Sequence, residues 1–180
     1  TMNRDFNDNL LPPIMGRNYE IGWKGEWNEG RLNTSVALYR TDKDNNNQRV
    51  NARPHPYWEP LDQSSRGLDA EISGSLTDRW QVYAGYTFNR STNRNSVGNN
   101  VESRRKGYNF SSHTPKHMFR LYTSYVLPVD DGKWTVGLGV KSSSKTANSY
   151  GSIKQGGYTI WNTNVQYRPS KNLQLGLAVN

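Results

Sequence analysis

The sequence predicts an all-β chain, an antiparallel meander of about eight long strands. Apolar and polar residues alternate repeatedly, and almost no stretch places apolar residues three and four positions apart over a helical length. Most alternating segments have about 9–11 residues, which a tilted strand needs to cross a bilayer, whereas globular strands usually have about 5–6. Short and long connections follow one another in turn. These three observations favour a transmembrane β-barrel.

The predicted strands are separated by turn-forming residues. In order, they are 19–27, 31–40, 67–76, 80–89, 117–126, 134–142, 158–167 and 173–180. Residues 1–18 precede them as an extracellular entry segment, and residues 19–180 form the partial barrel. The short connections are 28–30, 77–79, 127–133 and 168–172, and the long loops are 41–66, 90–116 and 143–157. Short turns at one rim and long loops at the other are typical of bacterial outer-membrane barrels.

Within each segment, residues of one parity are mainly apolar. In the first, Ile21 and Trp23 alternate with Glu20 and Lys24, which sends the two sets to opposite faces. The later apolar series are Leu68, Ala70, Ile72 and Leu76; Trp80, Val82, Ala84, Tyr86 and Phe88; Phe119, Leu121, Thr123 and Tyr125; Trp134, Val136, Leu138 and Val140; and Leu173, Leu175, Leu177 and Val179. The seventh segment fits least well, because Ile160 shares its parity with asparagines.

Alternation alone leaves open which face is inside, because a soluble barrel hides its apolar face and an outer-membrane barrel shows it to lipid. Aromatic residues lie towards segment ends on the apolar face, as membrane interfaces favour: Trp23, Trp27, Trp80, Tyr125, Trp134 and Tyr167. The opposite face carries charges such as Glu20, Glu71 and Arg120, which a small closed barrel would bury at high cost. The apolar face is therefore predicted to face lipid and the charged face the lumen.

Composition excludes several classes of protein. With 33% hydrophobic residues and a mean hydropathy of −0.94, the chain has no apolar run near the roughly 20 residues of a spanning helix. It has no cysteine, which excludes disulfides and thiolate metal sites. Its net charge of +8 lies mainly between the apolar segments and suits an anionic partner.

Enzyme chemistry finds little support in the sequence. His113 and His117 have a helical metal-ligand spacing, but Pro115 between them breaks the helix that would align them. The acidic pairs Asp42 with Asp44 and Asp130 with Asp131 have no surroundings that suggest separated pKa values. We therefore expect no catalytic residue and no metal ligand, and the chain is not expected to be an enzyme.

Five stretches carry a resemblance to a known family. They are PIMGRNYEIGWKGE at 13–26, RGLDAEISG at 66–74, WQVYAGYTF at 80–88, TPKHMFRL at 114–121 and NLQL at 172–175. Their order and spacing, over nearly all of residues 12–180, resemble TonB-dependent outer-membrane siderophore receptors, with Asp69 in place of the more usual glutamate. The resemblance implies the C-terminal part of a larger barrel, without the plug domain, the energy-coupling box and the last strands.

The same resemblance implies function and location. Such receptors bind and import ferric siderophores in the bacterial outer membrane; the iron travels within the ligand, so no cofactor is expected. The implied partners are the siderophore, the inner-membrane TonB complex acting through an N-terminal region absent from this chain, and outer-membrane lipid or lipopolysaccharide, but not nucleic acid. Two alternatives stay open: another cargo, such as cobalamin, a glycan or another metal chelate, and a soluble basic β-barrel binding module.

Candidate ligand-binding residues follow from residue type. The stretch 54–61 sets two aromatics among three prolines, and cations lie beside aromatics further along, which suits a chelate through stacking and charge. The loop candidates are Tyr57, Trp58, Arg105, Tyr108 and Tyr150, and the deeper, lumen-facing candidates are Tyr83, Arg120 and Tyr122. The loop cations would equally attract lipopolysaccharide phosphates.

Overall fold

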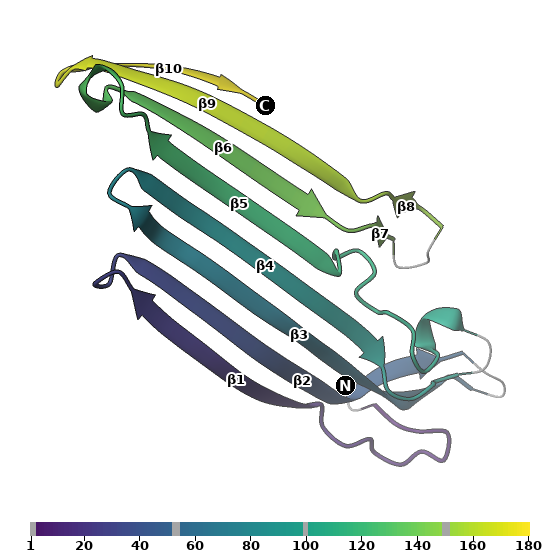
Figure 1. Ribbon diagram of the computed structural model, residues 1–180. Helices are drawn as coiled ribbons and strands as arrows, with labels where there is room; N and C mark the ends of the chain where they lie inside the picture. Colours follow the sequence, from purple (N-terminus) through teal and green to yellow (C-terminus); the bar gives the residue numbers. More distant parts are fainter. Residues whose placement is uncertain (1–2, 52–54, 99–100, 149–151) are drawn as a thin grey trace.

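The computed structural model describes residues 3–51, 55–98, 101–148 and 152–180. Eight strands form one antiparallel sheet in the order β1-β2-β3-β4-β5-β6-β9-β10 (Figure 1). Their bounds are β1 Met15–Trp27, β2 Leu32–Val50, β3 Tyr57–Thr77, β4 Trp80–Asn93, β5 His117–Val126, β6 Trp134–Ser143, β9 Tyr158–Ser170 and β10 Leu173–Val179. The smaller elements are the pair β7 Thr146–Ala147 and β8 Lys154–Gln155 and the 3₁₀ turns η1 Glu102–Arg104 and η2 Asp130–Gly132. Long strands pair in sequence order, so the predicted meander is confirmed.

The connections sort by length between the two ends of the sheet. The turns after β1, β3, β5 and β9 lie at one end, and the N-terminal segment, η1 and the β7-β8 pair lie at the other (Figure 1). In the tight turn after β1, Asn28, Glu29 and Gly30 all have positive φ, of 53°, 58° and 84°. Such turns match the twist of the paired strands that they join.

The expected loop 41–66 is wrong over most of its length, because β2 continues to Val50 and β3 begins at Tyr57. The added part lacks apolar alternation and is held by ladder hydrogen bonds and side-chain pairs, such as Asn46 Nδ2 to Gln63 Oε1 at 3.0 Å. A register shift at Lys43 to Asn46 separates it from the regular sheet. Without apolar alternation, the sequence pattern gives no signal for this extension. The other long strands lie within a few residues of their predicted bounds.

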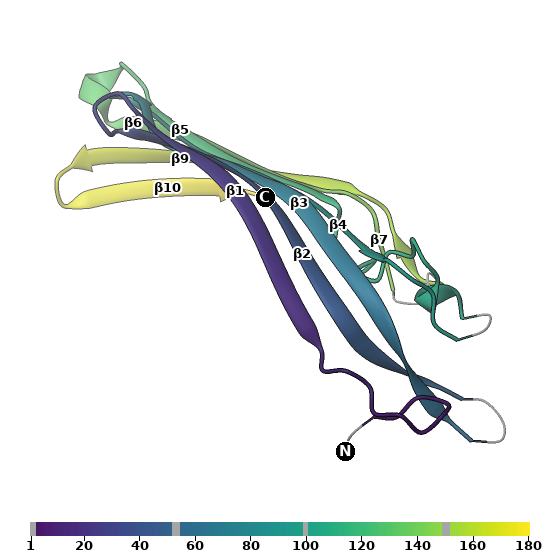
Figure 2. The ribbon, with the colours of Figure 1, turned by 90° about the horizontal axis from the view of Figure 1, so that it is seen from below.

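The sheet is a single twisted and curved layer (Figure 2). Its register aligns the apolar series across strands, as in Ile21 opposite Leu38 and Leu38 opposite Leu68. These side chains stay exposed: Ile21 by 73% and Leu38 by 51%. Among the described residues, no large side chain is completely buried. The apolar face therefore belongs to no closed core.

The seventh segment follows the same two-sided pattern. Trp161 lies opposite Val140 on the apolar side, and Ile160 lies opposite Lys141 on the polar side. Within the described ranges, no helix has the length and apolarity to cross a membrane.

Candidate functional site

Residues 93–98 and 101–108 fold back onto the ends of β2 and β3, residues 45–50 and 57–63, and together these stretches form what we call the outer platform. Its contacts are Arg104 Nη1 to Arg49 O (2.8 Å), Gly98 N to Glu59 Oε2 (2.9 Å), Asn95 Nδ2 to Pro60 O (2.9 Å) and Asp62 N to Asn95 Oδ1 (2.8 Å). A small apolar cluster lies inside it: Val50, Leu61 and Val97, with Tyr57 packed against them. The platform is thus an ordered support at the long-loop end.

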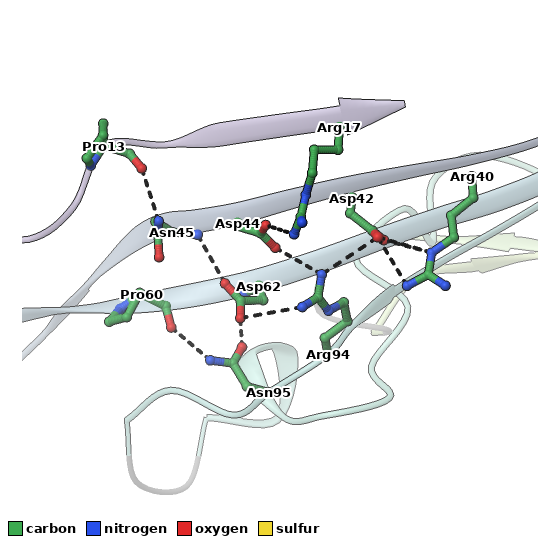
Figure 3. Close-up of polar contacts among 10 residues, drawn as sticks. All are labelled: Pro13, Arg17, Arg40, Asp42, Asp44, Asn45, Pro60, Asp62, Arg94 and Asn95. Carbon is green, nitrogen blue, oxygen red and sulfur yellow. Dashed lines mark hydrogen bonds and ion pairs between the residues drawn. The ribbon is translucent and has the colours of Figure 1, made fainter. Parts of the chain in front are cut away.

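An ion-pair network anchors this platform to the sheet. Figure 3 shows the Arg94 guanidinium directed toward the carboxylates of Asp42, Asp44 and Asp62. The distances from Arg94 are 2.9 Å to Asp44, 3.8 Å to Asp42 and 4.0 Å to Asp62. Arg17 of β1 also pairs with Asp44, and Arg40 of β2 pairs with Asp42 at 3.1 Å. The network therefore joins β1, β2 and β3 to the residue that follows β4.

Asp42 is the most enclosed acid of this network, with its side chain 7% exposed. A hydrogen bond from Ser64 holds the pKa of Asp42 below its ordinary value, and the charges of Arg40 and Arg94 act in the same direction. Burial opposes this shift without reversing it. The carboxylate is therefore charged at neutral pH, and the network is intact there.

Two of the predicted loop residues start β3 at the edge of the platform. The Tyr57 hydroxyl donates to Glu59 Oε1 at 3.0 Å, which raises the pKa of Tyr57, and its ring meets Phe6 edge-on at 5.3 Å. Phe6 in turn stacks on His55, with ring centroids 5.4 Å apart. The Trp58 backbone amide donates to Arg4 O at 2.9 Å. The N-terminal segment thereby joins an aromatic cluster at the long-loop end.

Two further loop candidates, Arg105 and Tyr108, lie after η1. Asn93 holds this turn, because its side-chain amide donates to Ser103 O at 3.0 Å and to Arg105 O at 3.3 Å, and its backbone amide donates to Tyr108 O at 3.0 Å. Four loop candidates thus belong to a single platform, and the Arg105 side chain is exposed there. Tyr150 lies outside the described residues.

The three deeper candidates share the polar face of β4 and β5. Tyr83 lies directly opposite Tyr122, and Arg120 lies opposite Gly85. The two tyrosines are 39% and 43% exposed, and the Tyr122 hydroxyl accepts a hydrogen bond from Asn164 Nδ2 at 3.4 Å. Hydroxyl, amide and guanidinium groups thus line one surface that could bind the oxygen atoms of a chelate.

Two further residues, Asn164 and Lys141, belong to this surface and were not among the predicted candidates. Asn164 crosses Gly137 of β6, where a Cβ atom would come within 2.9 Å of the asparagine Cγ, so glycine there makes room for the amide. Lys141 lies opposite Arg120 and adds a second cation. For Asn164 the sequence did give an indication, because Asn162 and Asn164 lie on the same face of the seventh segment.

A separate cleft of about 490 Å³ opens between residues 109–117 and the β7-β8 pair. Three lysines line it: Lys116, Lys145 and Lys154. The adjoining His117 ring nitrogen Nδ1 is 2.8 Å from the Tyr86 hydroxyl. In the part of the chain that the structure describes, no three His, Cys, Asp or Glu side chains gather as a metal site.

A family model described as "TonB dependent receptor-like, beta-barrel" matches residues 1–180. The chain belongs to this family. The ferric-pyoverdine M114 receptor PbuA of Pseudomonas sp. (strain M114) is 31% identical over 98% of this chain. The probable TonB-dependent siderophore receptor PiuA of Acinetobacter baumannii is 30% identical over 97%. The crystal structure of the Pseudomonas aeruginosa ferripyoverdine receptor bound to ferripyoverdine matches 98% of the chain with 31% identity and a TM-score of 0.75.

The TonB-dependent receptor family explains the exposed apolar face. Its members are outer-membrane β-barrel proteins, so this face is the lipid-facing side of such a barrel. The chain spans 22% of the length of PbuA and 24% of the ferripyoverdine receptor structure. The predicted family, fold and location are confirmed, and the ligand roles of the candidate residues stay predictions.

Proposed function

We propose that this chain forms part of the wall and outer mouth of a receptor that binds and imports a ferric siderophore. The proposal rests mainly on the similarity to siderophore receptors, which extends over nearly the whole chain. The placement of aromatic and cationic side chains at the long-loop end supports it. These groups suit an organic chelate that presents rings and oxygen atoms.

In this proposal the cargo meets the outer platform first and the lumen wall second. Tyr57, Trp58, Arg105 and Tyr108, together with Tyr150, would make the first contacts. Tyr83, Arg120 and Tyr122 would line the path below. Iron arrives already chelated, so the receptor needs neither a resident cofactor nor catalytic residues. Energy would come from the inner-membrane TonB complex through the N-terminal region of the complete receptor.

The alternatives fit the observations less well. A soluble binding module would not expose Ile21, Leu38 and Trp161 on one sheet face, and the family assignment also opposes it. Cobalamin, a glycan or another metal chelate would use the same barrel, but the relatives compared above are siderophore receptors. Growth on single iron chelates as the sole iron source separates these cargoes.

The test of loop capture replaces Trp58, Tyr108 and Tyr150 by alanine in the complete receptor. Iron-loaded pyoverdine and a ferric tris-catecholate serve as the two probes, with affinity and uptake as readouts. Loss of a side chain that anchors the ligand should weaken binding by about 1–3 kcal/mol, roughly a 5–150-fold increase in the dissociation constant. Tyr19→Ala, an exposed aromatic on the lipid-facing side, is the matched control.

Unchanged affinity and uptake in the triple variant would show that the loops do not hold the ligand. The lumen wall and the plug domain would then be the binding surface, and Tyr83→Ala with Tyr122→Ala would become the decisive variants.

A further inference from the structure

Three arginines lie side by side in one row of the sheet. Arg40 of β2 is the direct partner of Arg66 of β3, and Arg66 is the direct partner of Arg90 of β4. Directly opposite residues have Cα atoms about 4.5–5.5 Å apart, so the set spans roughly 10 Å. All three side chains are exposed. We call Arg40, Arg66 and Arg90 the arginine row.

The arginine row lies on the lipid-facing side, because side chains two positions apart share a face. The next residues of that face toward the short-turn end are Leu38, Leu68 and Phe88, which are themselves register partners. On β1, Tyr19 lies opposite Arg40. The row therefore marks the border where the apolar belt ends and the polar extension of the strands begins.

The charges of the arginine row are only partly compensated. Arg40 pairs with Asp42, but that carboxylate also takes a hydrogen bond from Ser64 and lies 3.8 Å from Arg94. Within the described residues, neither Arg66 nor Arg90 makes an ion pair or a side-chain hydrogen bond. Like charges directly opposite on neighbouring strands destabilise a sheet. An anion from outside the chain would relieve this repulsion.

We propose that the arginine row binds the phosphate groups of anionic lipid headgroups in the leaflet on the long-loop side. Guanidinium groups bind phosphate oxygens through paired, charge-assisted hydrogen bonds. The row's position at the edge of the apolar belt is the level of the headgroups, where fixed cations attract anionic lipid. This favours a lipid phosphate over one free in solution. The proposal depends on membrane location and is independent of the cargo.

The test uses the complete receptor in detergent micelles with two lipid probes, lipopolysaccharide and the same lipid after enzymatic removal of its phosphates. Lipid binding is read by native mass spectrometry and by the rise in the thermal unfolding midpoint. The double variant Arg66→Gln with Arg90→Gln should weaken binding of the phosphorylated lipid about 25-fold, or about fivefold for each arginine. Arg79→Gln, in the short turn that precedes β4, should leave binding unchanged.

A lysine pair, Arg66→Lys with Arg90→Lys, keeps the charge but loses the paired hydrogen bonds, so it should bind with intermediate affinity. Equal binding of the two lipids to the unaltered receptor would overturn the proposal, and that comparison stays decisive even if a variant fails to assemble. Full retention of phosphorylated lipid by the glutamine pair would also overturn it. Displacement of lipid by equimolar inorganic phosphate would show a site for free phosphate instead. Siderophore uptake need not change in any of these variants.

Discussion

Single residues on the polar face show why certain positions are glycine. Tyr39 of β2 extends across Gly67 of β3, and its hydroxyl accepts a hydrogen bond from Asn89 Nδ2 of β4 at 3.0 Å. A Cβ atom at position 67 would collide with the Tyr39 ring and with the Phe88 carbonyl oxygen. Because Gly67 has no side chain, Tyr39 can extend from β2 across β3 and form its hydrogen bond with β4.

Gly67→Ala should therefore destabilise the receptor by about 1–3 kcal/mol, because the ring or the strand backbone must shift. Urea unfolding of the complete receptor in detergent measures this. Gly85→Ala is the matched control on the same face, since its nearest neighbour would be the Ala70 carbonyl oxygen at 3.9 Å. Equal stability of the two variants would show that the contact of Tyr39 across Gly67 does not contribute to the free energy of unfolding.

Asp42 should give the outer platform a dependence on acid. Its pKa lies below the ordinary carboxyl value of about 4, so its stabilising effect is complete above that pH and is lost as the pH falls through the lower folded-state value. Hydrogen exchange of residues 93–98 and 101–108 should rise in that acidic window. It should not change between about pH 7 and pH 5 on account of this group.

Asp42→Asn removes the titrating group and should flatten this acid response while exchange at neutral pH increases. A response of the same size in the asparagine variant would assign the acid sensitivity to Asp44 or Asp62 instead.

At the scale of elements, β2 and β3 each consist of two parts, which form for different physical reasons. From Leu32 to Arg40, the side chains of β2 alternate between the lipid-facing and the lumen-facing side, and so do those of the β3 residues paired with them. Beyond Asp42 they continue as a hairpin without apolar alternation, which residues 93–98 and 101–108 cover. The barrel wall thereby extends past the apolar belt and carries the aromatic cluster of Tyr57 outward.

The facing of the strands can be tested on β5. Leu121 is in the middle of this strand on the lipid-facing side, opposite Ala84 and Val140. Leu121→Arg should lower the free energy of unfolding by about 2–4 kcal/mol if position 121 is near the bilayer midplane. Ser124→Arg, on the lumen side of the same strand, should cost much less, as native Arg120 on that side suggests. Folding in lipid vesicles measures both, and the reverse order would invert the assignment of the faces.

At the scale of the whole molecule, the sheet has two faces and two edge strands, and no large side chain among the described residues is completely buried. The edge strands β1 and β10 each have one partner in the sheet. Ile21 is 73% exposed on the first edge and Leu177 69% exposed on the last. Such a sheet gains its stability from lipid and from further strands at its edges.

The isolated 180-residue chain should therefore aggregate in plain buffer, whereas detergent should keep it dispersed. Analytical ultracentrifugation with and without detergent measures the difference, and the complete receptor in detergent is the reference. A monodisperse, cooperatively unfolding chain in plain buffer would instead favour a soluble binding module.

The strand order and the family could be predicted from the sequence alone, as could the division of each strand's side chains between two faces. Strand facing was readable because a period of two separates lipid from lumen, as Ile21 and Glu20 show. The ends of β2 and β3 could not be predicted, because a hairpin without apolar alternation has the sequence pattern of a loop.

Which distant residues meet depends on the pairing of the strands in the folded sheet. Arg94 lies 50 residues from Asp44, and the arginine row joins three strands whose register is set by turns and a bulge. The pattern within one strand gives a residue's face, but its height relative to neighbouring strands depends on pairing. For that physical reason the row at the membrane border and the outer platform became visible only in the folded sheet.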